Sequence, residues 1–119
     1  MNKIQNFTDL IAWQKGHKLV LRIYKITIQF PRIEAYALAD QMRRAVVSIT
    51  SNIAEGFSRK SNKEKTQFYY IAMGSLTEIQ NQLLIAKDLD YISESDFNEI
   101  IEQITTVKKL IFGLIRSLK

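Results

Sequence analysis

Apolar residues recur at three- and four-residue spacing along almost the whole chain, and very little interrupts that rhythm. The 119 residues include one proline and four glycines, so few positions break a helix. Spacing of this kind places apolar side chains on one face of an α-helix. The pattern predicts four helices, at about residues 8–30, 34–55, 61–90 and 93–118. No segment of any length alternates apolar and polar residues as a strand does.

Residues that start or stop helices stand at the expected boundaries. Pro31 ends the first helix, because proline disfavours helical geometry in the residue before it. Ser61 and Glu64 match a capping box, and Gly56 is expected to adopt the left-handed conformation common just past a helix end. Short connections favour antiparallel neighbours. The expected fold is therefore all-α, with a single domain (residues 1–119) forming an up-down-up-down four-helix bundle.

The composition excludes several kinds of catalytic chemistry. The chain has no cysteine, which removes disulfides and thiolate chemistry and fits a reducing cytoplasm, the location we expect. The single histidine, His17, has no glutamate three residues before it, so the di-iron motif of helical bundles is absent. His17 shares the expected apolar stripe of the first helix with Trp13, Tyr24 and Ile28, so a structural role is expected. We expect no enzyme activity, no cofactor and no metal site.

Membrane association is not expected either. No stretch approaches the ~18 uninterrupted apolar residues that a membrane-spanning helix needs. The first ten residues also lack the apolar run of a signal peptide. No membrane partner is therefore predicted.

Polar side chains form a strip beside the apolar stripe of the second helix, and the third helix carries a similar strip. If the two strips meet, they can form a hydrogen-bonded network that fixes the register of the helices, with arginine neutralising glutamate. The residues predicted for this network are Arg44, Ser48, Asn52, Glu55 and Glu78. Two alternatives remain open: a carboxylate site for a cation or ligand, and a solvated boundary.

The sides of the second and third helices that lie opposite their apolar stripes carry few charges. A helix in a monomeric bundle normally presents more charge there, so a second buried surface is expected. The residues predicted for this interface are Tyr36, Val47, Ala54, Tyr69 and Met73. Self-association is the simplest use of such a surface, and a partner protein would serve equally well.

Basic residues outnumber acidic ones, giving a net charge of +5, and they gather in two places. Four lie at the turn between the second and third helices, and four share one face of the first helix. The predicted nucleic-acid-binding residues are Arg59, Lys60, Lys63, Lys65, Lys15, Lys18, Arg22 and Lys25. Contacts of this kind are directed at the phosphate backbone of RNA or DNA, since no module with stacking aromatic residues is present. A solvated face is the other interpretation.

Particular segments of the chain resemble a known family. The segments are DLIAWQKGHKLVLRIYKIT, FPRIEAYALADQMRRAVVSITSNIAEGFSR and FYYIAMGSLTEIQNQLLIAKDL. Their most specific parts are the run from Asn52 to Gly56 followed by Arg59, and the run from Gly74 to Leu76 followed by Glu78. From about Phe7 to Lys119 the chain resembles the 23S rRNA-intervening-sequence proteins, also described as S23 ribosomal protein-like.

The resemblance implies an up-and-down helical bundle that assembles into a homopentamer with a basic surface and has no enzymatic activity. Members are encoded within insertions in bacterial 23S rRNA genes or elsewhere in bacterial genomes. A related group serves as an accessory subunit of diversity-generating retroelements, where it is thought to bind reverse transcriptase and nucleic acid. Two functions therefore stay open: an oligomer that binds RNA or DNA, and a structural or protein-interaction module with no nucleic-acid binding.

Overall fold

In the computed structural model, which describes residues 3–34 and 37–119, the chain forms four α-helices and no strand. The helices are α1 (Ile11–Thr27), α2 (Leu38–Ser58), α3 (Asn62–Asp88) and α4 (Glu94–Ser117). Short 3-10 turns at Phe7–Asp9 and Arg32–Glu34 precede α1 and α2. The prediction of an all-α four-helix bundle is confirmed.

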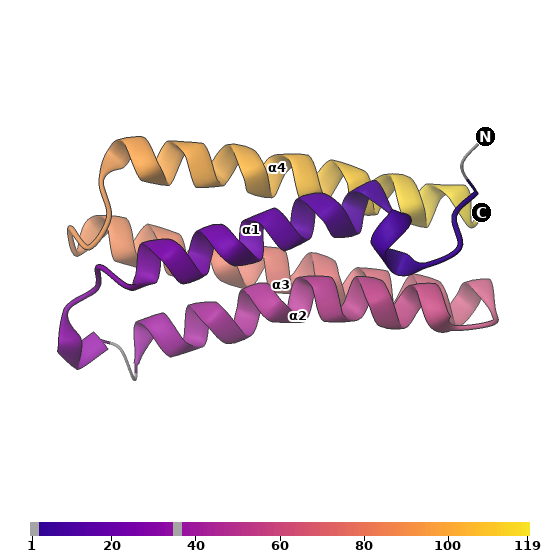
Figure 1. Ribbon diagram of the computed structural model, residues 1–119, viewed down its shortest axis with the longest axis horizontal. Helices are drawn as coiled ribbons and strands as arrows, with labels where there is room; N and C mark the ends of the chain where they lie inside the picture. The colour runs from indigo at the N-terminus through magenta and orange to yellow at the C-terminus, as the bar shows by residue number, and fades with distance from the viewer. Residues whose placement is uncertain (1–2, 35–36) are drawn as a thin grey trace.

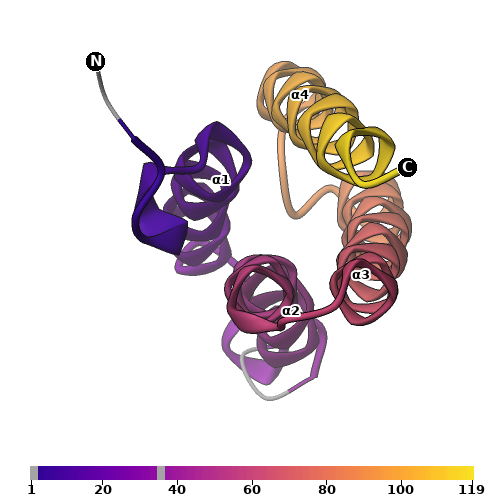
Figure 2. The same cartoon turned by 90° about the vertical axis from the view of Figure 1, so that its right-hand side faces the viewer.

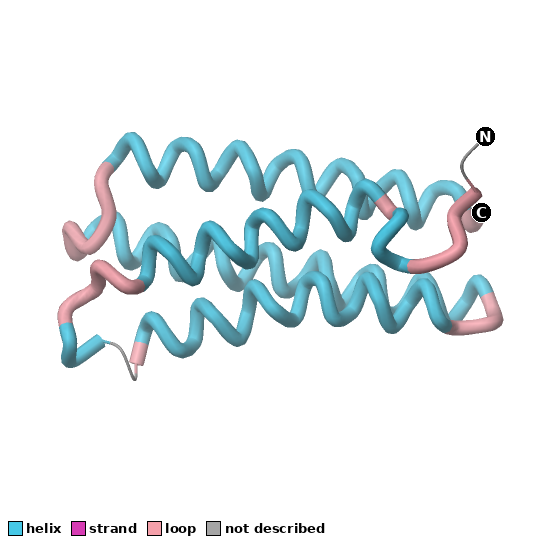
Figure 3. The backbone as a smooth tube through the Cα atoms, in the orientation of Figure 1, coloured by secondary structure: helices cyan, strands magenta, loops and turns pink. Residues whose placement is uncertain are grey.

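The four helices lie side by side around a shared core (Figures 1 and 2). α2 and α3 share the most extensive contact, and α1 packs against α2 and α4 while α3 packs against α4. Figure 3 shows that the connections are short and that the chain turns back at each of them. Both chain ends and the α2–α3 turn consequently lie at the same end of the bundle (Figure 1).

Serine residues begin both of the later helices. The Ser61 hydroxyl oxygen accepts a hydrogen bond from the Glu64 N–H at 3.1 Å, and the same hydroxyl donates to Glu64 Oε1 at 3.1 Å. Ser93 caps α4 by accepting a hydrogen bond from the Asp96 N–H at 3.0 Å. These contacts satisfy amide groups that have no partner within the first turn of a helix.

The prediction for Gly56 is wrong. Gly56 lies inside α2, which continues to Ser58, and none of the described glycines has a positive φ. The residue is glycine for another reason: the ring of Tyr69 packs against its backbone and leaves no room for a Cβ. A close approach of α2 to α3, rather than a helix end, explains this glycine.

The buried face of α1 also differs from the expected stripe. His17, Tyr24 and Ile28 are exposed, Ile28 by 75%. The face that enters the core instead carries Ala12, Leu19, Ile23 and Ile26. Both sets of residues have helical spacing, because α1 is apolar over more than one face. Packing against α2 and α4 selects the face that includes Leu19 and Ile23, which are fully buried.

The apolar stripes expected on the other helices enter the core. On α2 Met42 and Ile49 are fully buried, and on α3 Ile79 is fully buried. On α4 Ile111 is fully buried, whereas Lys108, which falls near the same stripe by spacing, is exposed. The apolar packing of these three helices follows directly from their residue pattern.

Candidate nucleic-acid interface

Basic residues are concentrated in one half of the bundle. We call this the terminal half, residues 3–18, 49–74 and 106–119, because it contains both chain ends (Figure 1). Of the described residues, the terminal half holds eleven lysines and arginines but only the three acidic residues Asp9, Glu55 and Glu64. The opposite half holds six basic and nine acidic residues. The positive charge of the chain is therefore polarised along the bundle.

The basic turn between α2 and α3 offers fewer free charges than the sequence indicates. Arg59 Nη2 donates to Glu55 Oε2 at 2.9 Å, and its guanidinium lies over the ring of Phe68. Lys65 Nζ donates to the Phe57 carbonyl oxygen at 2.7 Å, at the carboxyl end of α2. A cation in this position satisfies terminal carbonyl groups and interacts favourably with the helix dipole.

Lys60 and Lys63 are the remaining cations of the turn. Both are exposed, and within the described part of the chain neither has a hydrogen bond or ion pair. The turn thus presents two free lysines to solvent, rather than the four cations that its sequence contains.

The four basic residues share one face of α1, as their spacing predicts, but not all of their charges are free. Arg22 Nη2 donates to Asp96 Oδ1 at 2.9 Å and to Glu99 Oε2 at 3.0 Å, so its charge is used to join α1 to α4. Lys25 is exposed and lies in the opposite half. Lys15 and Lys18 remain together in the terminal half.

Lys15 and Lys18 line a hollow of about 600 Å³ between α1 and α4, which we call the α1/α4 groove. Lys109 of α4 lines the same groove, as do the hydroxyl-bearing Thr105 and Thr106. Toward the opposite half the groove ends at the carboxylates of Glu99 and Glu102. Sequence reasoning missed Lys109 because only the packing of α4 against α1 brings it beside Lys15 and Lys18.

The polar strips of α2 and α3 do meet, but only some of the predicted residues take part. Ser75 Oγ donates to Ser48 Oγ at 2.8 Å. Asn52 Nδ2 donates to Ser48 Oγ at 3.0 Å and to the Ser48 carbonyl oxygen at 2.8 Å. This places Ser48 at the centre of a small network that links the two helices.

The charged members of the predicted network lie outside it. Arg44 pairs with Asp40 at 3.1 Å, and Glu55 pairs with Arg59, both on the exposed surface of α2. Glu78 Oε2 accepts a hydrogen bond from Gln82 Nε2 at 3.3 Å on α3. Each charged residue therefore finds its partner four positions away in the sequence, and within the described part of the chain no arginine–glutamate pair crosses between α2 and α3.

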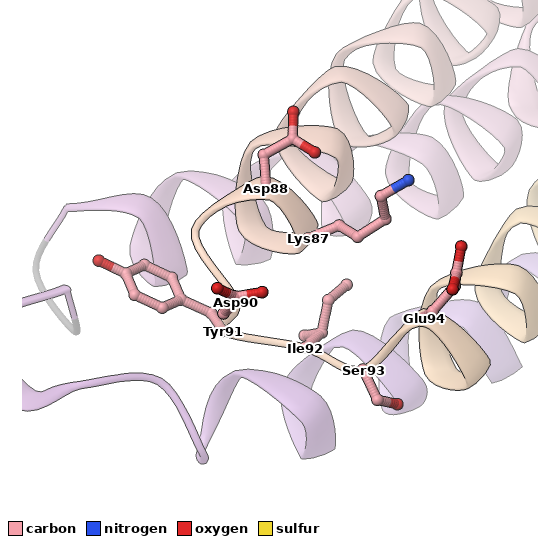
Figure 4. A pocket seen from close by; sticks show the side chains of 7 residues that line it. All are labelled: Lys87, Asp88, Asp90, Tyr91, Ile92, Ser93 and Glu94. Carbon is pink, nitrogen blue, oxygen red and sulfur yellow. The ribbon is translucent and has the colours of Figure 1, made fainter.

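A second hollow, of about 620 Å³, lies at the α3–α4 connection in the opposite half (Figure 4). Asp88, Asp90 and Glu94 line it together with Lys87, and Figure 4 shows the carboxylates spread around the hollow rather than directed at one point. Among the described residues, no group of three or more histidine and acidic side chains could hold a metal ion.

The predicted interface residues have different surroundings. Tyr36 lies outside the described residues. Tyr69 is wrong as an interface residue because it is only 3% exposed and packs against Gly56 within the subunit. This burial raises the pKa of the Tyr69 hydroxyl above its usual value. Val47 is exposed, while Ala54 and Met73 are half-buried.

The outer surface of α3 carries further exposed apolar residues, of which sequence reasoning missed Ile71 and Ile85. Tyr70 and Ile71 are exposed, and Ile85 lies four turns further along the same helix, also exposed. The sequence already indicated an uncharged surface on this helix, because Glu78 is the only charged residue between Lys65 and Lys87.

The fold and the charge distribution together define a class of protein, a small helical bundle with a basic half. The chain belongs to the family of 23S rRNA-intervening sequence proteins, whose model matches residues 8–113. A similar solved structure is that of a protein with unknown function from the S23 ribosomal protein family of Bacteroides thetaiotaomicron VPI-5482. It is 22% identical, with a TM-score of 0.79 over 88% of this chain and 98% of that chain.

The similarity to that structure, at 22% identity, supports the fold alone. No curated protein matches the chain. None of the described helices is both long enough and apolar enough to cross a membrane.

Proposed function

We propose that this protein is an oligomer that binds the phosphate backbone of RNA or DNA through the lysines of its terminal half. The observation that carries the proposal is the convergence of Lys15, Lys18 and Lys109 on the α1/α4 groove. Lys60 and Lys63 add two further unpaired charges at the same end of the bundle. The proposal includes no catalytic step.

The distribution of ion pairs supports lysines rather than arginines as the contacting residues. Arg22 and Arg59 already hold carboxylates, so a phosphate would have to displace those partners. The groove lysines form no ion pair with the described acidic residues and can neutralise phosphate directly, which releases condensed counterions from the nucleic acid. Glu99 and Glu102 repel phosphate at the far end of the groove, so the strand is held toward the terminal half.

Self-association is part of the proposal because the middle of α2 and α3 presents an uncharged outer surface. No charged residue occurs between Arg44 and Glu55, and Glu78 is the only one between Lys65 and Lys87. The resemblance to the family supplies the number of copies, a homopentamer. Repetition of the lysines around a ring would raise the effective concentration of each further phosphate contact.

A salt titration of binding to unrelated RNA and DNA oligomers tests the function. The double variant Lys18→Gln with Lys109→Gln removes one charge from each side of the groove. Its matched control, Lys25→Gln with Arg32→Gln, removes two exposed charges from the opposite half. We expect the groove variant to reduce the slope of log K against log salt by about 1.4–1.8, and the control to leave it unchanged.

Two results would contradict nucleic-acid binding through the groove: no binding at low salt, or the same loss of slope in both double variants. An oligomer that binds no nucleic acid would instead support the second candidate function, a structural or protein-interaction module. The uncharged surface of α2 and α3 is the observation that favours that alternative.

A further inference from the structure

Three aromatic rings contact one another at the start of α1. Phe7 meets Trp13 edge-on, with 5.4 Å between the ring centroids and 66° between the planes. Trp13 and His17 are stacked nearly parallel, with centroids 4.7 Å apart and 12° between the planes. Trp13 is half-buried, whereas His17 is exposed. The imidazole is therefore held in a fixed plane at the surface.

One face of the exposed imidazole is covered by an aromatic ring. Trp13 lies against that face, and His17 makes no hydrogen bond within the described part of the chain. The ring consequently presents a flat, pre-ordered surface to solvent. A ligand that stacks on it does not have to immobilise a mobile side chain, which lowers the entropy cost of binding.

The position of His17 associates this ring with the lysines of the terminal half. Lys18 is its neighbour in the sequence and Lys15 lies two residues before it, and both reach the α1/α4 groove. Successive residues of a helix point about 100° apart, so His17 lies beside Lys18 on the outer surface of α1 and does not itself line the groove. A polyanion that extends from Lys18 around the outside of α1 meets the exposed imidazole. A planar group attached to that polyanion can reach the ring.

We propose that His17, held by Trp13, is a stacking platform for an unpaired nucleobase, and that the protein prefers single-stranded nucleic acid. The inference rests on the proposed function and specifies its substrate class. Bases in a duplex stack on each other, whereas unpaired bases are free to stack on aromatic side chains. Such stacking tolerates any sequence because every base has a π-face.

The test compares a single-stranded oligonucleotide with a duplex of the same length at fixed salt, using wild type, His17→Ala and His17→Phe. His17→Ala should weaken single-strand binding about tenfold, within the range known for base–aromatic stacking, and leave duplex binding unchanged. His17→Phe should restore single-strand binding because it keeps a flat ring without a charge. The salt slope should be the same for all three proteins, since no phosphate contact is removed.

Trp13 provides a second readout, because it is the only tryptophan in the chain. Its fluorescence should change when the single strand binds and stay constant with the duplex, since only an unpaired base alters the stack on His17. Folding of the variants is checked by their circular dichroism and melting temperature.

The possible failures are distinguishable. If wild type binds neither oligonucleotide, the proposed function and the stacking platform both fail. If wild type binds both equally and His17→Ala has no effect, phosphate binding stands and the platform is overturned. Equal weakening of single-strand and duplex binding by His17→Ala, or no recovery in His17→Phe, would also overturn it.

Discussion

Gly56 on α2 lies so close to Tyr69 on α3 that a Cβ at position 56 would come within 2.6 Å of the ring carbon Cε1. Tyr69 is almost fully buried, so its ring cannot move aside freely. The contact lies where the short turn brings the end of α2 against the start of α3. Gly56 therefore allows the two helices to approach at the point where the chain reverses.

Gly56→Ala should lower the free energy of unfolding by about 1–3 kcal/mol, because the added methyl group overpacks the contact with Tyr69. Gly74→Ala is the matched control, since nothing lies within 4 Å of its added Cβ. There the gain in helix propensity should raise the free energy of unfolding by about 0.5–1 kcal/mol. Urea denaturation at one protein concentration measures the free energy of unfolding of both variants. A stabilised Gly56→Ala protein would contradict the close contact.

Arg22→Gln should lower the free energy of unfolding by about 1 kcal/mol, because it removes two charge-assisted hydrogen bonds that join α1 to α4. Arg44→Gln removes an exposed pair within α2 and should change stability by less than about 0.5 kcal/mol. Denaturation at low and high salt measures the loss of stability in each variant. Added salt should bring the loss caused by Arg22→Gln closer to that caused by Arg44→Gln, because salt screens the charges. Equal effects at low salt would show that the Arg22 contacts do not stabilise the bundle.

Tyr69 should make stability fall at alkaline pH. Burial raises the pKa of its hydroxyl in the folded protein above the unfolded value of about 10, so the neutral form is favoured by folding. This contribution is fully present below the unfolded pKa and is lost as the pH rises through the folded pKa. Tyr69→Phe should flatten the decline in stability that denaturation measures as the pH rises through and above the unfolded pKa, and Tyr70→Phe, at an exposed position, should not. An identical decline in all three proteins would rule out this role for Tyr69.

Ile71→Glu and Val47→Glu should each dissociate the proposed oligomer while helicity is retained. Both side chains are exposed in the subunit, by 51% and 38%, so a charge there does not disturb the core but opposes an apolar contact between copies. Light scattering at micromolar concentration measures the mass. Leu21→Glu, at an exposed position on α1, is the control and should leave the assembly intact. A wild-type monomer would refute self-association directly.

The helix starts could be predicted because they depend on neighbouring residues. Ser61 and Glu64 are three positions apart and satisfy each other without help from the rest of the fold. The buried face of α1 could not be predicted in this way. Its sequence offers two apolar faces with the same spacing, and only the positions of α2 and α4 decide between them.

In the candidate site, too, some contacts follow from local spacing and others depend on how the helices pack. The pairing of Arg59 with Glu55 follows the four-residue spacing of ion pairs along a helix, so the sequence already contained a reason to discount that charge. The α1/α4 groove joins Lys18 to Lys109, which are far apart in the sequence and meet only through packing. Propensity and spacing alone do not indicate such a pair.

The separation of charge along the bundle gives the subunit an electric dipole along its longest dimension, which measures 44 Å. In the field of a polyanion, such a dipole experiences a torque before any contact forms, and the basic half turns toward the polyanion. Encounters are then dominated by one orientation, in which the acidic α3–α4 connection faces away. Added salt should therefore slow association as well as weaken the final complex, because screening removes the torque over distances beyond about 10 Å.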